Sequence, residues 1–223
     1  MSRKIAALIA VREGSKRVVD KNIRPFCDSS LLEIKVRQAL QIEGLSEVVV
    51  SSDSDKMLGI ASNLGATTLK RPDEYATDSV PMSGVYVHLA NNIDCDDVVY
   101  LHVTSPLLLT QTLQECVDTY KGLEGYDSLA TVHRVQEYLW YNGKPLNYDP
   151  TNHPRSQDLP EICALNFAVN IIPRDLMIDR RNLVGNNFYP FRLDEVESID
   201  VDSKVDFIKA EFLYEMLNFN QGA

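Results

Sequence analysis

The feature that most constrains this chain is an apolar run that passes directly into a cluster of positive charge. Residues Ile5 to Val11 form an unbroken apolar stretch of strand length, with no alternation of polar residues. Such a run is typical of a strand buried on both faces of a parallel sheet. It predicts a strand near the centre of a sheet that carries helices on both sides.

The segment after this strand is strongly basic, although the whole chain has a formal net charge of -10. Like charges at the carboxyl end of a buried strand repel one another, so a bound anion would stabilise them, and open α/β sheets bind ligands at that end. On charge pattern alone, a solvated basic loop remains an equal alternative. The cations within residues 12–24 are Arg12, Lys16, Arg17, Lys21 and Arg24.

This basic loop lacks the two commonest backbone cradles for phosphate. A Walker loop requires GxxxxGK[ST] and a dinucleotide loop requires GxGxxG, whereas Gly14 is the only glycine in this loop. An anion here would therefore be held by side chains.

The acidic balance of the chain argues against a general affinity for nucleic acid or anionic membranes, because both require a basic face. The N-terminal apolar run is too short for a signal peptide and is interrupted by Arg12 and Glu13, and no segment reaches membrane-spanning length. We therefore expect a cytoplasmic protein with neither nucleic acid nor a membrane as a partner.

Strand patterns alternate with helical patterns along most of the chain. This alternation predicts an α/β fold of three layers, with a doubly wound, mostly parallel sheet whose strand-end loops converge on one crevice. Strands are expected at 47–50, 66–69, 97–103 and 162–172. Helices are expected after the capping box of Ser30 and Glu33, at 55–64, around 82–89 and from near Thr110. The small polar residues before 55–64 are expected to cap that helix. An amphipathic helix is expected at the C-terminal end, with Val205, Ile208, Phe212, Leu213 and Met216 as its apolar residues.

The pattern changes in the segment that we bound at residues 133–162. Tyr138, Trp140 and Tyr141 surround an Asn142-Gly143 pair, which is typical of a β-hairpin turn. Exposed aromatic residues on such an inserted arm more often form a packing or subunit surface than a catalytic one.

Two aspartates near the C-terminal end form a candidate metal site. Asp200 and Asp202 are two residues apart on a segment that reads as extended, so both carboxylates point to one side while Ile199 and Val201 face the core. Hard oxygen ligands of this kind suit Mg²⁺, which prefers one or two carboxylates together with substrate phosphates. The alternative, that Asp202 caps the terminal helix, stays open on spacing alone.

Four short blocks lie in order along the chain: VREGSKRVVDKNI at 11–23, SSDSD at 51–55 with RPDEYATD at 71–78, YLHVTSPL at 100–107, and SIDVD at 198–202. Together they resemble the blocks of one enzyme family, the CMP-sialic acid synthetases (acylneuraminate cytidylyltransferases). The resemblance implies one Rossmann-like nucleotidyltransferase domain over residues 1–223 and a homodimer, with 133–162 as a dimerisation arm that reaches the partner's site.

The resemblance also implies a reaction. A hydroxyl of a sugar acid, sialic or a related nonulosonic acid, would attack the α-phosphorus of CTP and release pyrophosphate. Such a displacement depends on positioning and on neutralising negative charge more than on a covalent nucleophile. The partners expected from it are CTP and a small sugar acid, with Mg²⁺ as the cofactor.

Residue roles follow from the resemblance position by position. Arg12, Lys21 and Asp200 are the expected catalytic residues, and Asp200 and Asp202 would hold the metal. Lys16 is a less certain phosphate ligand, because surface solvation remains the favoured interpretation for Lys16, Arg17 and Arg24. The expected substrate-binding residues are Ser15, Lys16, Asn22, Arg71, Asp78, Ser79, His102, Arg155 and Asn166.

Departures from the family pattern concentrate on the sugar side. His102 stands where glutamine is usual, and it is open whether it contacts the sugar, accepts a proton or belongs to the core. Phe167 replaces a glycine after Asn166, and one residue is inserted after Arg155. The acceptor is therefore open, and the alternatives are a 3-deoxyoctulosonic acid or a sugar phosphate as acceptor, another base, or a non-catalytic nucleotide-sugar binder of the same fold.

Overall fold

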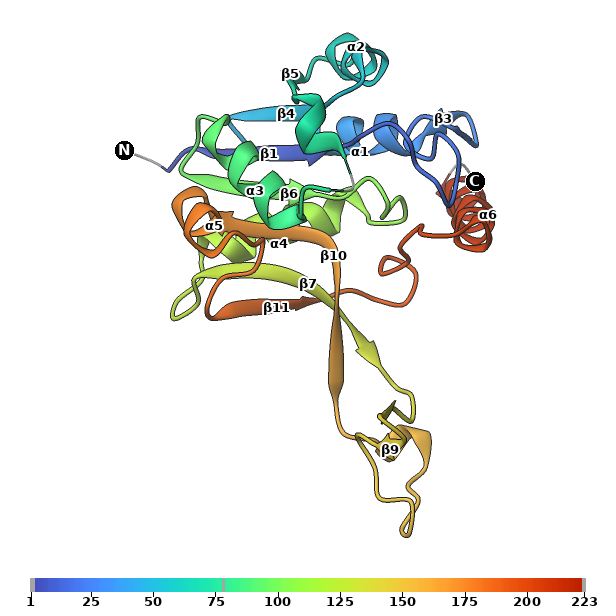
Figure 1. Cartoon of the computed structure of the whole chain (residues 1–223). Helices are drawn as coiled ribbons and strands as arrows, with labels where there is room; N and C mark the ends of the chain where they lie inside the picture. The colour runs from blue at the N-terminus through green and yellow to red at the C-terminus, as the bar shows by residue number, and fades with distance from the viewer. Residues whose placement is uncertain (1–2, 78, 222–223) are drawn as a thin grey trace.

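The computed structural model describes residues 3–77 and 79–221. One seven-stranded sheet runs through the molecule in the order β11-β7-β10-β6-β1-β4-β5, with helices on both faces (Figure 1). The strands are β1 (Ile5–Ala10), β4 (Glu47–Ser52), β5 (Thr67–Lys70), β6 (Asp97–Leu101), β7 (Ser128–Val135), β10 (Ile162–Pro173) and β11 (Phe188–Arg192).

The central position predicted for the first strand is confirmed. β1 lies between β4 and β6 and pairs with both in parallel. Its side chains alternate between two hydrophobic cores: Ile5 and Ile9 point to one, while Ala6 and Leu8 point to the other. Because both faces are covered, the strand carries no polar alternation.

The sheet is mostly parallel, as predicted, and β10 is the exception. It runs antiparallel to both β6 and β7, with a break in its β7 pairing between Leu165 and Asn170. The edge strand β11 pairs with β7 in parallel. The sequence pattern did not predict β11, because Pro190 interrupts it, and proline is tolerated in a sheet mainly on an edge strand such as this one.

Helices cover the two faces unequally. The capping box predicted for the first of them is formed in part, since the Ser30 hydroxyl accepts a hydrogen bond from the Glu33 amide at 3.3 Å and donates one to the Glu33 carboxylate at 2.8 Å. One core packs against α1 (Leu31–Leu40), α2 (Asp55–Asn63), α4 (Thr110–Lys121) and α6 (Lys204–Gln221), and the other against α3 (Met82–Asn91) and α5 (Arg174–Arg180). Short elements complete the fold: β2 (Pro25–Phe26), β3 (Ser29–Ser30), β8 (Trp140–Tyr141), β9 (Lys144–Pro145), η1 (Asp73–Ala76) and η2 (Ser156–Asp158).

The terminal helix α6 is confirmed, but the face it buries is not the one its apolar stripe suggested. Val205, Ile208, Phe212 and Met216 are 48–65% exposed. The buried side carries Phe207 instead, whose ring meets that of Phe26 edge-on at 5.3 Å between centroids. The helix has two apolar sides, and aromatic contacts decide which one faces inward.

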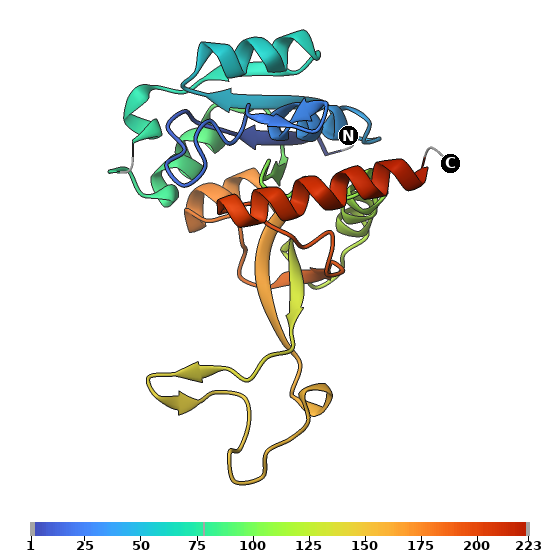
Figure 2. The ribbon, with the colours of Figure 1, turned by 90° about the vertical axis from the view of Figure 1, so that its right-hand side faces the viewer.

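The segment between β7 and β10 extends well away from the sheet and its helices (Figures 1 and 2). Its tip is the predicted hairpin: β8 pairs with β9, and Asn142 and Gly143 take positive φ values of 50° and 74°. Two successive residues with positive φ form the turn that matches strand twist best. Trp140, Tyr141 and Leu146 are exposed on this arm.

None of the helices within the described ranges is both long enough and apolar enough to cross a membrane.

Candidate active site

A cavity of about 390 Å³ opens where β1 and β6 end. It brings together six of the predicted site residues from distant parts of the chain. Larger hollows lie between α1 and α6 and near Arg3 and Tyr120, but neither contains a predicted site residue. The cavity is lined by residues of the basic loop and of the turn after β6, among them Arg12, Ser15, Lys16, Lys21, Asn22 and His102.

The basic loop is fixed to the end of β1 by its own polar groups. The buried Asn22 donates from Nδ2 to the Arg12 carbonyl at 3.1 Å, and the Val11 amide donates to the Ser51 carbonyl at 2.9 Å. Gly14 has φ 77°, a left-handed conformation that glycine adopts without strain. The loop therefore turns back over the strand end and presents its cations to the cavity.

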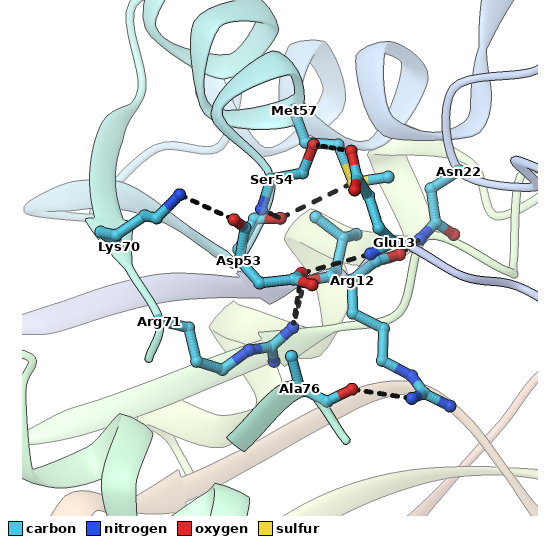
Figure 3. Close-up of polar contacts among 11 residues, drawn as sticks. Arg12, Glu13, Asn22, Asp53, Ser54, Met57, Lys70, Arg71 and Ala76 are labelled. Carbon is cyan, nitrogen blue, oxygen red and sulfur yellow. Dashed lines mark hydrogen bonds and ion pairs between the residues drawn. The ribbon is translucent and has the colours of Figure 1, made fainter. Parts of the chain in front are cut away.

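Arg71 ties this loop to the neighbouring strands (Figure 3). Its Nη2 donates to the Val11 carbonyl and lies 3.8 Å from Asp53 Oδ1, while Asp53 also accepts a hydrogen bond from the Glu13 amide at 3.2 Å. Burial lowers the pKa of Arg71, against the opposing effects of Tyr100 and Asp53. Its buried Nε has no hydrogen-bond partner in the described part of the chain.

Arg12 and Ser54 complete the same network (Figure 3). Arg12 Nη1 donates to the Ala76 carbonyl at 2.8 Å. Ser54 occupies the N-cap position of α2, but its side chain makes no cap hydrogen bond and donates to Glu13 Oε1 at 2.5 Å instead. The predicted polar cap of this helix is therefore not formed by Ser54, because the hydroxyl holds the basic loop.

The C-terminal carboxylates lie against the basic loop. Lys21 Nζ donates to the Val201 carbonyl at 2.6 Å and lies 3.7 Å from Asp202 Oδ1, and Arg17 Nη2 pairs with the same oxygen at 2.9 Å. The α6 cap is made by others: the Ser203 hydroxyl accepts from the Asp206 amide at 3.2 Å. Asp202 therefore pairs with cations of the basic loop, whereas Ser203 makes this cap of α6.

The protonation of this cluster is shaped by its surroundings. Burial lowers the pKa of Lys21, and the charges of Asp202 and Asp200 oppose the effect. Asp200 remains open to solvent on one side. Protein packed around the rest of its carboxylate raises the Asp200 pKa, a hydrogen bond with Thr104 lowers it, and the Asp202 charge raises it further. A cation placed between the two carboxylates would relieve that repulsion.

These residues fit a magnesium ion that shares its coordination with a substrate. In residues 3–77 and 79–221, no group of three or more His, Cys, Asp or Glu side chains is placed to hold a metal. Two partly exposed carboxylates are nevertheless sufficient for Mg²⁺, which keeps waters and takes its remaining ligands from substrate phosphates. The basic loop alongside is where such phosphates would lie.

His102 differs from the cations of the cavity because its imidazole ring is uncharged at neutral pH. Burial lowers its pKa to about 4, with Lys35 and Lys21 adding to the effect. Its buried Nε2 lacks a hydrogen-bond partner among the described residues. At neutral pH His102 is thus an uncharged imidazole with one free ring nitrogen at the cavity.

Phe167 stands beside His102, with 6.1 Å between the ring centroids. It has φ 58°, the left-handed conformation that suits glycine, in the irregular part of β10. Its neighbour Asn166 accepts the Ala168 amide at 3.2 Å on Oδ1, while its buried Nδ2 is without a partner in the described ranges. Phe167, which stands where the family pattern has glycine, therefore has a strained backbone conformation close to His102.

Six predicted residues within the described ranges do not line this cavity: Arg71, Ser79, Arg155, Asn166, Asp200 and Asp202, although Asp202 lies 3.7 Å from Lys21, which does line it. Ser79 bonds to the hydroxyl of Thr77 at 2.6 Å in an exposed loop, and Asp78 lies outside the described residues. Arg155 is on the arm, 75% exposed, and pairs with Asp158 at 2.9 Å. Within a single chain, Arg155 does not line the cavity.

Several residues of this network had no individual role in the sequence analysis. Arg17 is exposed, as favoured, and its side chain also pairs with Asp202. Thr104 bonds to Asp200, and Asp53 anchors both Arg71 and the Glu13 amide. The available signal was position: Thr104 and Asp53 each follow the end of a parallel strand, where polar residues gather at ligand sites.

Comparison with known proteins agrees with this geometry. A family model described as "Cytidylyltransferase" matches residues 6–162. The chain belongs to the cytidylyltransferase family. The N-acylneuraminate cytidylyltransferases of Escherichia coli O18:K1:H7 and Oncorhynchus mykiss are 28% and 31% identical to it over 93% and 94% of this chain. These matches bear out the resemblance to CMP-sialic acid synthetases.

Coverage of the relatives differs. The chain spans about half the length of those two, 51% and 50%. A CMP-N,N'-diacetyllegionaminic acid synthase of Legionella pneumophila is 26% identical to this chain. The match covers 96% of this chain and 97% of that protein. Among solved structures, a CMP:2-keto-3-deoxy-manno-octonic acid synthetase complexed with CTP has a TM-score of 0.71 at 14% identity, over 96% of this chain and 99% of that one. That structural match shows a shared fold.

Proposed function

We propose that this protein transfers the cytidylyl group of CTP to a sugar acid, sialic or a related nonulosonic acid, with Mg²⁺ as cofactor. The observation that carries the proposal is the meeting of Lys21 with Val201 and Asp202, which joins the basic loop of one end of the chain to the carboxylate pair of the other. Cations beside a pair of carboxylates are what a metal-bound triphosphate requires.

In this proposal the phosphates lie along the basic loop. Arg12 and Lys21 neutralise charge that develops on them, with Ser15 and Lys16 on the same wall. Asn22 and Arg71 hold the loop that faces the cytidine, through the carbonyls of Arg12 and Val11. Asp200 and Asp202 would hold Mg²⁺, which neutralises phosphate charge when bound.

The chemical step is a displacement at phosphorus. The sugar hydroxyl oxygen forms a bond to the α-phosphorus, the bond from that phosphorus to the bridging oxygen breaks, and pyrophosphate leaves with the electron pair while the hydroxyl proton passes to water. His102 is a hydrogen-bonding group for the acceptor, because its low pKa leaves it uncharged at neutral pH. Asn166, which precedes the Phe167 ring beside His102, would contact the acceptor as well.

We also propose that two chains assemble through the arm, in the cytosol. The aromatic residues Trp140 and Tyr141 are exposed on the arm, and Arg155 lies on the same arm, where it would meet the acceptor only in the partner's cavity. Light scattering should give the mass of a dimer, and Trp140→Ser with Tyr141→Ser should reduce it to that of one chain.

The test of activity is direct. The protein is incubated with CTP, Mg²⁺ and a panel of sialic, legionaminic and 3-deoxyoctulosonic acids, and products are read by mass spectrometry and pyrophosphate release. We expect one CMP-sugar acid, no product when ATP, GTP or UTP replaces CTP, and no product with EDTA. Absence of product across the panel, together with CTP binding that does not depend on Asp200 or Asp202, would identify a non-catalytic binder.

A further inference from the structure

A lysine lies completely buried behind the cavity. Lys35 is on α1, 0% exposed, four residues after Leu31 and three after Leu32, so it occupies the apolar stripe of that helix. Lysine is almost never buried without a partner, because removing its charge from water is costly. The stripe position is a sequence signal that marks Lys35 as unusual.

The ammonium group of Lys35 is engaged with the turn that follows β6. Nζ donates to the Ser105 carbonyl at 3.0 Å and to Gln38 Oε1 at 2.7 Å. Gln38 in turn donates from Nε2 to the Leu108 carbonyl at 2.5 Å. Two side chains of α1 therefore hold carbonyl oxygens at both ends of the segment from Ser105 to Leu108.

This turn has no helix or strand ladder of its own to fix it. Just beyond Leu108, Oε1 of Glu197 accepts the Leu109 amide at 2.9 Å. Buried backbone groups in irregular segments need such side-chain partners. Lys35, Gln38 and Glu197 together supply them.

The same turn connects the cavity to the carboxylate pair. His102, Val103 and Thr104 line the cavity. The Thr104 carbonyl accepts the Val201 amide at 2.8 Å, and its side chain bonds to Asp200. A shift at Ser105 would therefore move the adjacent Thr104 and, through it, the segment that carries Asp200.

The charge of Lys35 also reaches the cavity. Lys35 lowers the pKa of His102 more than Lys21 does, although Lys21 lines the cavity and Lys35 does not. Burial lowers the pKa of Lys35 to about 7, and the negative charge of Glu197 opposes this effect. Positive potential from a buried cation decays less than that of an exposed one, because less water screens it.

We propose that Lys35 is a positioning residue of the transfer site, which holds the 102–108 turn from behind the cavity and so sets where Asp200 and His102 stand. The proposal rests on the proposed cytidylyl transfer. It assigns to α1 a part in catalysis that involves no contact with substrate.

The test compares Lys35→Met, Lys35→Gln and the control Lys56→Met, which removes an exposed lysine and changes net charge equally. Lys35→Met should lower kcat about tenfold with a smaller change in KM for CTP, the scale of one charge-assisted hydrogen bond. Lys35→Gln, which keeps a donor, should retain more activity, and it serves if the methionine variant fails to fold. Lys56→Met should match the wild type.

A second readout does not need turnover. Hydrogen exchange of amides in 102–109 and 198–202 should be faster in Lys35→Met than in the wild type and unchanged in Lys56→Met. A wild type with no turnover would reject the proposed function and leave the exchange comparison to decide on Lys35. Unchanged kcat in an active Lys35→Met enzyme, or unchanged exchange in both segments, would overturn the positioning role.

Discussion

The nucleotide side and the arm of this molecule are built in opposite ways. On the nucleotide side, side chains cross-link segments far apart in the sequence: Arg71 to Val11 and Lys21 to Val201. On the arm, polar contacts stay within it, such as that of Tyr138 with the Pro154 carbonyl and that of Arg155 with Asp158. The contrast teaches that contacts between distant segments position the proposed phosphate side within one chain, whereas the arm is held by its own contacts and leaves Trp140 and Tyr141 exposed.

The largest expected effect comes from removing Lys21, the cation that links the basic loop to the C-terminal carboxylates. Lys21→Met should lower kcat/KM for CTP by about a thousandfold, because it removes a phosphate ligand and the bond to Val201 at once. Arg24→Gln, in the same loop but outside the cavity lining, is the matched control and should stay near wild type. Equal losses in the two variants would mean that only the overall charge of the loop matters.

A second prediction concerns the metal and pH. Asp202→Asn should raise the Mg²⁺ concentration for half-maximal rate by roughly tenfold, since one hard ligand is lost. Asp200 has a raised pKa, so wild-type activity that needs its carboxylate is present at higher pH and lost as pH falls through that raised value. Removing the Asp202 charge should move this acid limb to lower pH. A limb that stays in place would show that another group controls it.

A third prediction tests the proposed sugar side of the site with the variant Phe167→Gly. Glycine suits the positive φ at this position and removes the ring beside His102. We expect KM for the sugar acid to change several-fold, the scale of one apolar contact, while the CTP dissociation constant stays within about twofold. Steady-state kinetics and calorimetry separate the two. A large change in CTP binding would place Phe167 on the nucleotide side.

The smallest expected effect comes from the outer stripe of α6. Phe212→Ser should change the free energy of unfolding by no more than about 0.5 kcal/mol, because its ring is exposed. Phe207→Ala on the inner side of the helix should cost about 3–5 kcal/mol. Urea denaturation measures both, and a large loss for Phe212→Ser would show that the outer stripe is covered in solution.

Much of the fold was predictable because its signals are local. The unbroken apolar run of β1, the capping serine of α1 and the Asn142-Gly143 turn each act within a few residues, and each forms where the pattern places it. The antiparallel course of β10 and the inward face of α6 depend instead on contacts with distant segments, which periodicity does not record.

The same division holds for the site. Arg12 and Lys21 follow the first buried strand and the aspartates are two residues apart, so residue types and spacing made them candidates, and the family resemblance supplied their expected roles. The partners Arg17, Thr104 and Lys35 act through single hydrogen bonds or ion pairs to groups far away in sequence. Such pairings appear only when the chain is folded.

The most direct test of the account is a double-mutant cycle on CTP binding with Lys21→Met and Asp202→Asn, measured by calorimetry with and without Mg²⁺. If the basic loop and the carboxylates close on one magnesium-bound triphosphate, the two losses should be strongly non-additive with Mg²⁺ and closer to additive without it. Losses that simply add in both conditions would show that Lys21 and Asp202 serve separate sites, and would contradict the account.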